Sequence, residues 1–482
     1  MLVLENTKPK RVFHYFEEIA KIPHASYNTK GIVDYLEGFA KEHSLSYNRD
    51  KHDNIIIYKE ASAGYEDCET VIIQGHSDMV AEKTLESTHD FATQGLNLVV
   101  EGDYLSAKDT TLGADDGIAV AMALAILEDD TLLHPAIEVL ITSNEEVGLL
   151  GAMQVDASAL KGTRLINLDS EGEGILLAGC AGGVTINSLI PVKFGKDENT
   201  SFEIAIGGLK GGHSGAEIDK NRANANALMG RVLRTIDEQV KYTVAEFEGG
   251  DKGNVITPSS RACIMAKKEE GAKLEQIIAL LESNLRNEYA NSDDGITITI
   301  SKLGAMQTEV LDHKSKEKLI FLLTYIPFGV HKMSGVVPGL VETSSNIGLA
   351  KLTTKGIEIH CSIRSMIGSA KDALANQVKL LTEFWGGEYS TNGDYPAWEF
   401  KKVSPLRDVI TQIYQDMFKQ TMKVEAIHAG LECGILHDKM PYLDCVALGP
   451  NIDDIHSPDE RISILSTERT WELLLEILKE LK

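Results

Sequence analysis

Several common features are absent from this chain of 482 residues, and each absence excludes a class of chemistry. Its six cysteines contain no Cys-x-x-Cys pair, which disfavours both a disulfide framework and an all-cysteine metal site. No Gly-x-Ser-x-Gly elbow occurs, and this weakens a serine-hydrolase interpretation. The glycine-rich segment 207–212 lacks the Walker lysine and serine, so it does not predict a phosphate-binding loop.

Basic residues are also scarce, with 47 Lys and Arg against 72 Asp and Glu and a formal net charge of −25. We therefore expect neither nucleic acid nor membrane as a partner, because phosphate binding needs a basic surface. The longest apolar stretch, around 118–127, is too short to span a bilayer, and the first residues lack the pattern of a secretory signal. These features predict a soluble, cytoplasmic protein with reduced cysteines.

One short run stands where a sheet is expected to bind its ligand. Residues Gly75–Asp78 follow Val71–Ile73, which is predicted to be a buried strand. Open α/β sheets bind ligands just beyond the carboxyl ends of such strands, so His76 and Asp78 are candidates for a site. An ordinary loop pair is the alternative for a single His-x-Asp motif.

Other acidic or histidine-containing clusters follow apolar segments in the same way. If the preceding strands share one sheet, five side chains converge on one pocket: His76, Asp115, Glu146, Asp169 and His456. Two simpler explanations remain open at this point. The Asp115–Asp116 pair can cap the helix that follows it, and Glu145–Glu146 can be a surface pair.

The predicted set combines imidazoles with carboxylates, which suits Zn²⁺ and also Mn²⁺ or Co²⁺ as substitutes. Five ligands are too many for one tetrahedral catalytic ion that keeps an open position for water. They suit two ions if one carboxylate bridges, and Asp115 in its stiff turn is the candidate bridge. The sequence therefore predicts two Zn²⁺ ions in each subunit.

Glu145 and Glu146 need separate roles, because adjacent side chains on an extended segment point in opposite directions. We assign Glu146 to the metal and Glu145 to proton transfer with the activated water. The carboxylate of Asp78 is predicted to accept the second ring N–H of His76 and so to fix its tautomer.

These motifs carry a resemblance to a known family. Segments that resemble the M20 metallopeptidases are Gly75–Asp78, Leu112–Gly117, Glu145–Glu146 and His456–Pro458. Segments that resemble the aminoacyl-histidine dipeptidase branch of that family are Gly211–Gly215, Glu358–Ser365 and His428–Gly434. The likeness extends over nearly the whole chain. It implies an α/β fold with two domains, in which a mixed-sheet catalytic domain of zinc-peptidase type carries an inserted α+β lid.

The resemblance also implies roles for individual residues. It implies one zinc ion on His76, Asp115 and Asp169. It implies a second zinc ion on Asp115, Glu146 and His456. Glu145 is then the general base and later the proton donor to the leaving amine. The peptide bond between Asp115 and Asp116 is expected to be cis, as in related enzymes.

The domain organisation follows from a change of pattern after the first α/β segment. We predict a catalytic domain formed by residues 1–182 and 394–482, interrupted by a lid and dimerisation domain at 183–393. The insertion holds two successive groups of strands and helices, so a homodimer and a monomer with a duplicated lid both fit. We expect the homodimer, because symmetrical pairing is the commonest oligomeric state.

By resemblance, the lid supplies the groups that select substrate. His213 is expected to stabilise the oxyanion, and Arg364 to pair with the substrate carboxylate through its planar fork. Asn254 is expected to assist, and Glu432 is a candidate for binding the substrate's amino group. The alternatives are a turn histidine for His213, a strand-edge charge for Arg364 and a turn residue for Asn254.

The sequence therefore predicts a dizinc dipeptidase that hydrolyses unblocked dipeptides, including those with C-terminal histidine. A related aminoacylase or carboxypeptidase would use the same metal pair on N-blocked or longer substrates. A non-catalytic metal-binding scaffold would keep the ligands and lack the base. The presence of Glu145 and Asp78 argues against the scaffold.

Overall fold

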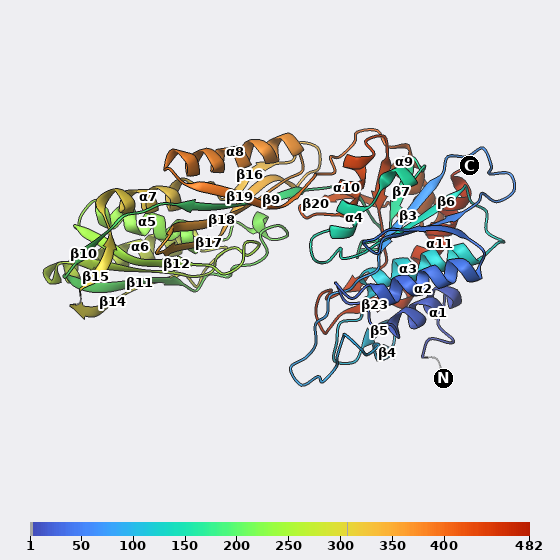
Figure 1. The fold of residues 1–482 in the computed structure, drawn as a ribbon, viewed down its shortest axis with the longest axis horizontal. Helices are drawn as coiled ribbons and strands as arrows, with labels where there is room; N and C mark the ends of the chain where they lie inside the picture. Colours follow the sequence, from blue (N-terminus) through green and yellow to red (C-terminus); the bar gives the residue numbers. More distant parts are fainter. Residues whose placement is uncertain (1–2, 306) are drawn as a thin grey trace. The chain divides into compact units, whose positions relative to one another are not determined.

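The computed structural model describes residues 3–305 and 307–482, which form two compact units with separate apolar cores (Figure 1). Unit 1 contains the chain up to Cys180, Trp398–Ala426 and Leu431–Lys482. Unit 2 contains Ala181–Ala397 and Ile427–Gly430. The sequence analysis placed the domain boundaries after residues 182 and 393. In the structure the chain enters unit 2 after Cys180, returns after Ala397 and visits unit 2 again at 427–430.

Unit 1 is built on an eight-stranded mixed sheet in the order β1-β2-β6-β3-β7-β21-β8-β20. Its strands are β1 (Ser46–Arg49), β2 (Ile55–Lys59), β3 (Val71–His76), β6 (Ile137–Thr142), β7 (Arg164–Asn167), β8 (Ile175–Cys180), β20 (Lys423–Ile427) and β21 (Asp444–Ala447). The central strands β6, β3, β7 and β21 run parallel. Every residue of β3 and β6 is buried, as expected for central strands covered on both faces.

The helices of unit 1 surround this sheet, and a small second sheet lies beside them. The helices are α1 (Lys10–Ala20), α2 (Lys30–Glu42), α3 (Ala114–Glu128), α4 (Leu150–Gln154), η1 (Ala157–Ala159), α9 (Pro405–Phe418), α10 (Glu432–Lys439) and α11 (Ile464–Glu480). The second sheet has the order β22-β23-β5-β4, with β22 (Ile452–Asp453), β23 (Arg461–Ser463), β5 (Tyr104–Ala107) and β4 (Leu98–Glu101).

Helix α3 forms the centre of the unit 1 core. It is apolar on all sides after its first residues and is buried from Ala114 to Leu127, which is typical of an interior helix. The side chain of Lys59 in β2 donates to the carbonyl oxygens of Ile126, Leu127 and Asp129 at 3.1, 3.0 and 2.9 Å. These bonds satisfy carbonyls at the carboxyl end of α3 that have no partner within the helix.

Unit 2 contains an antiparallel sheet in the order β14-β11-β13-β12-β17-β18-β9-β19, with β16 also paired to β17. Its strands are β9 (Gly182–Ile190), β11 (Thr200–Gly207), β12 (Tyr242–Gly249), β13 (Ser260–Ala266), β14 (Thr297–Ala305), β16 (Gly329–Met333), β17 (Val341–Thr353), β18 (Gly356–Ser365) and β19 (Glu388–Tyr395). A separate pair is formed by β10 (Phe194–Asp197) and β15 (Thr308–Leu311). The helices are η2 (Ile218–Lys220), α5 (Ala225–Asp237), η3 (Lys268–Glu270), α6 (Gly271–Glu288), α7 (His313–Tyr325) and α8 (Gly368–Phe384).

Burial alternates along β9, β11 and β18, so one face of this sheet packs on the core and the other is more open. The two groups of strands foreseen in the sequence share one sheet. They join at β12 and β17 through the pairs Glu248–Lys351 and Gly249–Ala350. The predicted α/β fold with an inserted α+β unit is confirmed.

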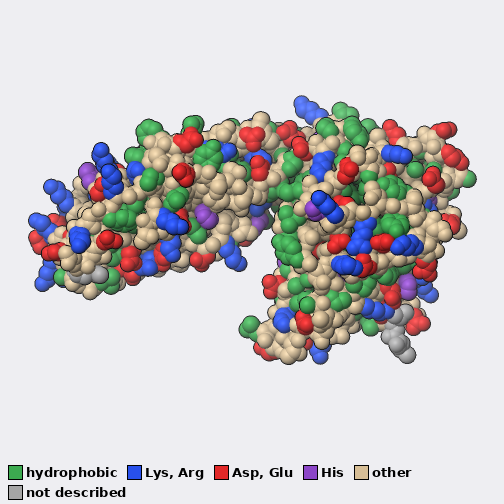
Figure 2. Space-filling view, in the orientation of Figure 1, with side chains coloured by type: hydrophobic (Ala, Val, Ile, Leu, Met, Phe, Trp, Pro, Cys, Tyr) green, Lys and Arg blue, Asp and Glu red, His purple; other side chains and the backbone are tan. Residues whose placement is uncertain are grey.

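Two surface properties bear on possible partners. Among the described residues, no helix has the length and apolar character needed to cross a membrane. On the face shown in Figure 2, Lys and Arg side chains are interspersed with Asp and Glu rather than gathered in one basic area. This mixture is consistent with the net charge of −25 and offers no phosphate-binding patch on that face.

Candidate metal centre

The candidate centre lies at the carboxyl ends of the parallel strands of unit 1. In the sheet register, His76 at the end of β3 pairs with Thr142 at the end of β6, and Gln74 pairs with Asn167 at the end of β7. The segments that follow these strands therefore leave the sheet at one edge. This edge carries three of the predicted sets of side chains: His76 with Asp78, Glu145 with Glu146, and Asp169.

The carboxylate of Asp115 lies between two imidazoles. Its Oδ1 is 3.1 Å from His76 Nε2, and its Oδ2 is 3.2 Å from His456 Nε2. His456 Nε2 also lies 3.0 Å from Glu146 Oε2, and His76 Nε2 lies 3.8 Å from Asp169 Oδ1. The five ligands predicted from the sequence thus come together, with Asp115 in the middle.

Candidate ligand atoms fall into three overlapping sets, with the atoms of each set within 4.8 Å of one another. These sets are His76, Asp116 and Asp169; His76, Glu145 and Glu146; and Asp115, Glu146 and His456. Asp116 was not among the residues predicted from the sequence, although it belongs to the Asp pair noted there. Its Oδ2 accepts the backbone N–H of His76 at 3.1 Å, and a Cβ at Gly75 would lie 2.5 Å from that oxygen. Gly75 therefore provides the space that Asp116 occupies.

The main chain fixes the orientation of His76. Its Nδ1 lies 2.9 Å from the backbone oxygen of Asp78 and 3.6 Å from the Asp78 carboxylate. The carboxylate, which was predicted to accept the ring N–H, is the more distant of the two partners. It instead accepts the hydroxyl of Ser26 at 2.8 Å and the backbone N–H of Glu145 at 2.9 Å. Asp78 thereby ties the His76 segment to the Glu145 segment.

The expectation that Glu145 and Glu146 point in opposite directions is wrong. β6 ends at Thr142, and Asn144 has a φ of 53°, so the two residues lie in a turn rather than on an extended strand. One carboxylate oxygen of each lies within 4.8 Å of the other and of a ring nitrogen of His76. A turn releases neighbouring side chains from the alternation that a strand imposes.

The peptide bond between Asp115 and Asp116 is cis, as the resemblance implies. Both residues also have non-helical backbone angles, although they stand within the first turn of α3.

The electrostatics of the centre suit a divalent cation. Burial raises the pKa of Glu145, Asp116 and Asp169 well above ordinary values; His76 opposes the shift, and neighbouring carboxylates add to it. Burial also acts to raise the pKa of Asp115, but hydrogen bonds with His456 and His76 hold it below the usual range. Imidazole nitrogens and carboxylate oxygens at these distances match the ligands of Zn²⁺ and Mn²⁺. The residues therefore fit the metals that the sequence predicts, because cations would offset the repulsion among the carboxylates.

A second group of predicted residues lies in unit 2, with His213 in the loop after β11, Asn254 in the loop between β12 and β13, and Arg364 on β18. The backbone of His213 forms a bridge with Val255, and Ser214 N–H donates to the backbone oxygen of Asn254 at 2.9 Å. His213 Nδ1 accepts the backbone N–H of Ala216 at 3.0 Å, so the other ring nitrogen, Nε2, carries the proton of the neutral ring. Burial, and then the charge of Arg364, lower the pKa of His213 and favour that neutral form.

Arg364 lies close to His213 on β18, at a position whose neighbours in the strand are buried. A Cβ at Gly215 would lie 3.0 Å from His213 Cε1, 3.2 Å from Arg364 Cζ and 2.8 Å from the backbone oxygen of His428. Only glycine fits between these groups. Arg364 Nη1 donates to Tyr395 Oη at 2.9 Å, while its buried Nε has no hydrogen-bond partner among the described residues.

His428 is a member of this unit 2 group that received no role in the sequence analysis. Its Nε2 lies 2.7 Å from the hydroxyl of Ser344, and burial followed by the charge of Arg364 lowers its pKa to about 4. The only signal in the sequence is its place in the segment 428–434, which resembles the dipeptidase branch.

Glu432 occupies a different kind of position from the one expected. It has no exposed surface and stands at the first residue of α10 in unit 1. Its carboxylate accepts the side-chain N–H of Gln74 and the hydroxyl of Thr142, the latter at 2.6 Å. Burial raises its pKa to about 7. These contacts make Glu432 a buried support beneath the ends of β3 and β6 rather than a group open to the substrate's amino end.

Comparisons with known proteins give the family. A family model described as peptidase family M20/M25/M40 matches residues 72–480. The chain belongs to this family. The cytosol non-specific dipeptidase of Escherichia coli (strain K12) is 37% identical over 488 residues, which cover 100% of this chain and 99% of that protein.

Solved structures agree with this family membership. The aminoacylhistidine dipeptidase from Vibrio alginolyticus has a TM-score of 0.92 at 32% identity and covers 99% of this chain and 98% of that one. The aminopeptidase PepT from Bacillus cereus has a TM-score of 0.58 at 15% identity over 98% of this chain and 99% of that one, which is a likeness of fold.

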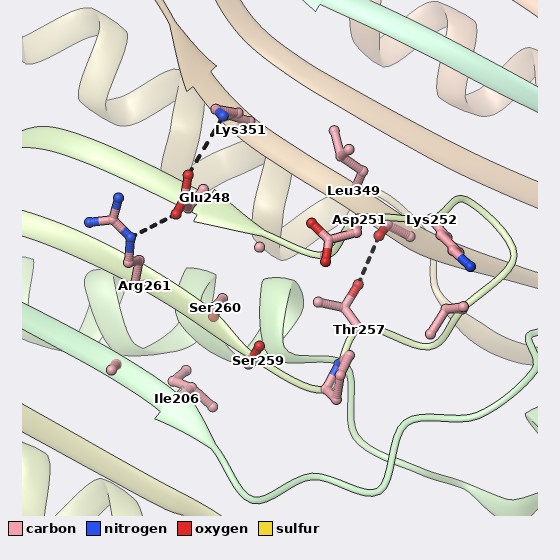
Figure 3. Close-up of a pocket in the computed structure, with 16 residues that line it drawn as sticks. Ile206, Glu248, Asp251, Lys252, Thr257, Ser259, Ser260, Arg261, Leu349 and Lys351 are labelled. Carbon is pink, nitrogen blue, oxygen red and sulfur yellow. Dashed lines mark hydrogen bonds and ion pairs between the residues drawn. The ribbon is translucent and has the colours of Figure 1, made fainter. Parts of the chain in front are cut away.

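A groove of about 630 Å³ on unit 2 does not contain the predicted site residues (Figure 3). Three of its charged side chains are paired, since Glu248 accepts from Arg261 at 2.7 Å and lies 3.6 Å from Lys351, and Asp251 and Lys252 also line the groove. Thr257 Oγ1 donates to the backbone oxygen of Gly348 at 3.2 Å. None of the residues that line this groove is a candidate metal ligand or a predicted substrate-binding residue.

The lowered pKa of His428 predicts that the stability of unit 2 depends on pH. With a pKa of about 4 in the folded chain and an ordinary value of 6.5, the unfolded chain binds a proton that the folded chain does not as pH falls through this range. The free energy of unfolding should therefore fall by up to about 3 kcal/mol between pH 7 and pH 4 through this residue. Unfolding measured across that range should show a weaker pH dependence in His428→Gln than in the natural chain, and parallel curves would contradict this account.

Proposed function

We propose that this M20 chain is a metal-dependent dipeptidase that hydrolyses unblocked dipeptides, including those with C-terminal histidine. The observation that carries the proposal is the Asp115 carboxylate, whose two oxygens face His76 and His456 at 3.1 and 3.2 Å. The substrate class rests on two similar proteins, which are named a cytosol non-specific dipeptidase and an aminoacylhistidine dipeptidase.

We assign two Zn²⁺ ions to the centre, with Co²⁺ or Mn²⁺ as substitutes. The first ion is held by His76, Asp115 and Asp169. The second ion is held by Asp115, Glu146 and His456. Asp116 also lies within range of His76 and Asp169, but its Oδ2 already accepts the backbone N–H of His76, so we assign it to support. When bound, such ions polarise a carbonyl group and lower the pKa of a water molecule toward neutrality.

Glu145 is proposed as the group that moves the proton. Burial raises its pKa, which makes its carboxylate a stronger acceptor for a proton from water, and the proton can then pass to the leaving amine. The hydrogen bond from its backbone N–H to Asp78 Oδ1 fixes the main chain at this residue. We therefore assign proton transfer to Glu145. We assign to Asp78 the orientation of Glu145.

The unit 2 residues are proposed to bind the substrate. His213, neutral and carrying its proton on Nε2, can donate to an oxyanion. Arg364 can pair with a free carboxylate, since Nε and one side of its guanidinium are not used by Tyr395. Asn254 is assigned a supporting role next to His213. Glu432 is not assigned to the amino group, because it is buried and hydrogen-bonded inside unit 1.

Substrate choice separates this proposal from its rivals. We expect the metal-loaded protein to hydrolyse Ala-His and to leave N-acetyl-Ala-His and Ala-Ala-His intact, with activity lost on chelation and restored by Zn²⁺. Chromatographic separation of the products would measure each rate. Cleavage of the blocked or longer peptide would instead favour an aminoacylase or carboxypeptidase, and absence of all cleavage by the zinc-loaded protein would favour a metal-binding scaffold.

Two variants test the division of roles within the centre. Glu145→Ala should lower kcat by at least about 10³-fold while both metal ions remain bound, because it removes proton transfer and no assigned ligand. Asp115→Ala should lose metal as well as activity, because both ions share that carboxylate. Metal content after dialysis and kcat should be measured on the same samples. Retained turnover in Glu145→Ala would remove Glu145 from the mechanism.

We further propose a cytoplasmic homodimer. The name of the Escherichia coli relative supports the cytosol, and the six cysteines of this chain are all free, which suits a reducing compartment. Large apolar side chains are exposed on α7 and α8, including Tyr325, Leu380 and Phe384, and support an association surface on unit 2. Light scattering after gel filtration should give the mass of a dimer, and only monomer across a concentration series would contradict this.

A further inference from the structure

The carboxylate of Glu460 accepts hydrogen bonds from the main chain next to Asp115. Oε2 accepts the N–H groups of Leu112 and Gly113 at 2.7 and 3.0 Å, and Oε1 accepts those of Ala114 and Asp115 at 2.8 and 3.3 Å. The side chain is buried, with 2% of the residue exposed. One carboxylate therefore holds the whole turn that leads into α3 and presents the Asp115 side chain.

This contact differs from an ordinary helix cap in where its acceptor comes from. A cap residue normally stands next to the helix that it caps. Here the acceptor lies 345 residues from Asp115 in the sequence, on the segment that also carries His456. The same interaction therefore satisfies the free N–H groups at the start of α3 and joins two segments that each carry a candidate metal ligand.

His456 needs such an anchor, because the core does not hold it. Its side chain is 47% exposed, and its backbone φ is 60°. The segment after it is folded back by local bonds, in which Ser457 Oγ donates to the backbone oxygen of Asp454 and Glu460 N–H donates to the backbone oxygen of Ser457. Beyond Glu460, the chain enters β23, which pairs with β5. The hydrogen bonds of Glu460 thus connect the turn that contains His456 to the turn that contains Asp115.

We propose that Glu460 is a positioning residue that sets the distance between Asp115 and His456 and thereby the affinity of the cation site formed by Asp115, Glu146 and His456. This rests on the metal centre of the proposed function. The site on the other side of Asp115 depends less on Glu460, because β3 and β7 place His76 and Asp169 directly. Loss of Glu460 therefore weakens one cation site more than the other.

Glu460→Gln is the sharpest probe, because it keeps the size of the side chain. An amide has one oxygen, so two of the four N–H groups would face an NH₂ donor instead of an acceptor. The matched control is Glu138→Gln. Glu138 is also a buried acid of unit 1, and its carboxylate accepts the N–H groups of Lys161 and Gly162 at 2.9 and 3.0 Å, near the opposite end of β6 from the centre.

The experiment titrates the metal-free natural protein and both variants with Co²⁺, following heat and visible absorption. We expect the natural protein and Glu138→Gln to bind two ions, and Glu460→Gln to bind one of them about 10 to 100-fold more weakly, the usual cost of losing a group that orients a ligand. His456→Ala should weaken the same step, and adding Glu460→Gln to it should cost little more. If Glu460→Gln does not fold, Glu460→Asp, which keeps the charge and shortens the reach, replaces it.

The outcomes separate this inference from the proposed function. Unchanged binding of both ions in the folded Glu460 variant, or equal weakening of both steps, overturns the positioning role. Selective weakening of the same step in Glu138→Gln also overturns it, because the effect would then reflect lost stability alone. Two-ion binding without dipeptide hydrolysis by the natural protein would reject the dipeptidase proposal while leaving the role of Glu460 intact.

Discussion

The geometry of the candidate centre depends on one shared group, the Asp115 carboxylate, because each of its oxygens faces a different imidazole. A shared carboxylate holds this position only if its main chain is fixed. Three features fix it: Gly113 has a φ of 65°, α3 begins at Ala114, and Glu460 accepts the N–H groups around the turn. The helix that follows is held at its other end by Lys59. The buried helix α3 thus gives the Asp115 side chain a rigid backbone.

Gathering several carboxylates in a buried pocket opposes folding, because charges lose their hydration there and repel one another. The surrounding chain limits this cost with a continuous polar network beneath the strand ends. Asn167 donates to Gln74 at 2.6 Å, and Gln74 and Thr142 both donate to Glu432. This network crosses β7, β3 and β6, so it holds the three strand ends in register. A preorganised site of this kind trades stability for fixed donors and acceptors.

The sequence predicted the parts of this structure that depend on local pattern. Apolar strands followed by His76, Asp169 and His456 indicated which side chains converge, because the parallel arrangement of such strands is a strong rule. The orientation of side chains in irregular turns was harder to predict from the sequence. The opposite orientation expected for Glu145 and Glu146 assumed an extended backbone, which the turn at Asn144 does not have. Strand β19 of unit 2 is exposed along most of its length and its residues carry no apolar alternation, so the sequence pattern gives little signal for it.

Support by distant residues could not be foreseen for a different reason. Glu460 and Glu432 act on segments far away in the sequence, at Asp115 and Gln74, and a single chain gives no signal for such pairs. In the sequence, Glu460 received no role, and Glu432 was a candidate for binding the substrate's amino group. Their burial alone distinguishes them, and burial follows from tertiary packing rather than from neighbouring residues.

The unit 2 group follows a different electrostatic principle from the metal centre. It contains one permanent charge, Arg364, and that charge together with burial keeps His213 and His428 neutral by lowering the pKa of each. Because the Ala216 N–H occupies Nδ1 of His213, the remaining ring nitrogen is a donor whatever else binds. The group therefore presents donors around a single guanidinium without adding a second cation. Such an arrangement suits the anionic oxygen that we propose it binds, because hydrogen bonding and charge act together, and it avoids the repulsion that a cluster of protonated histidines would create.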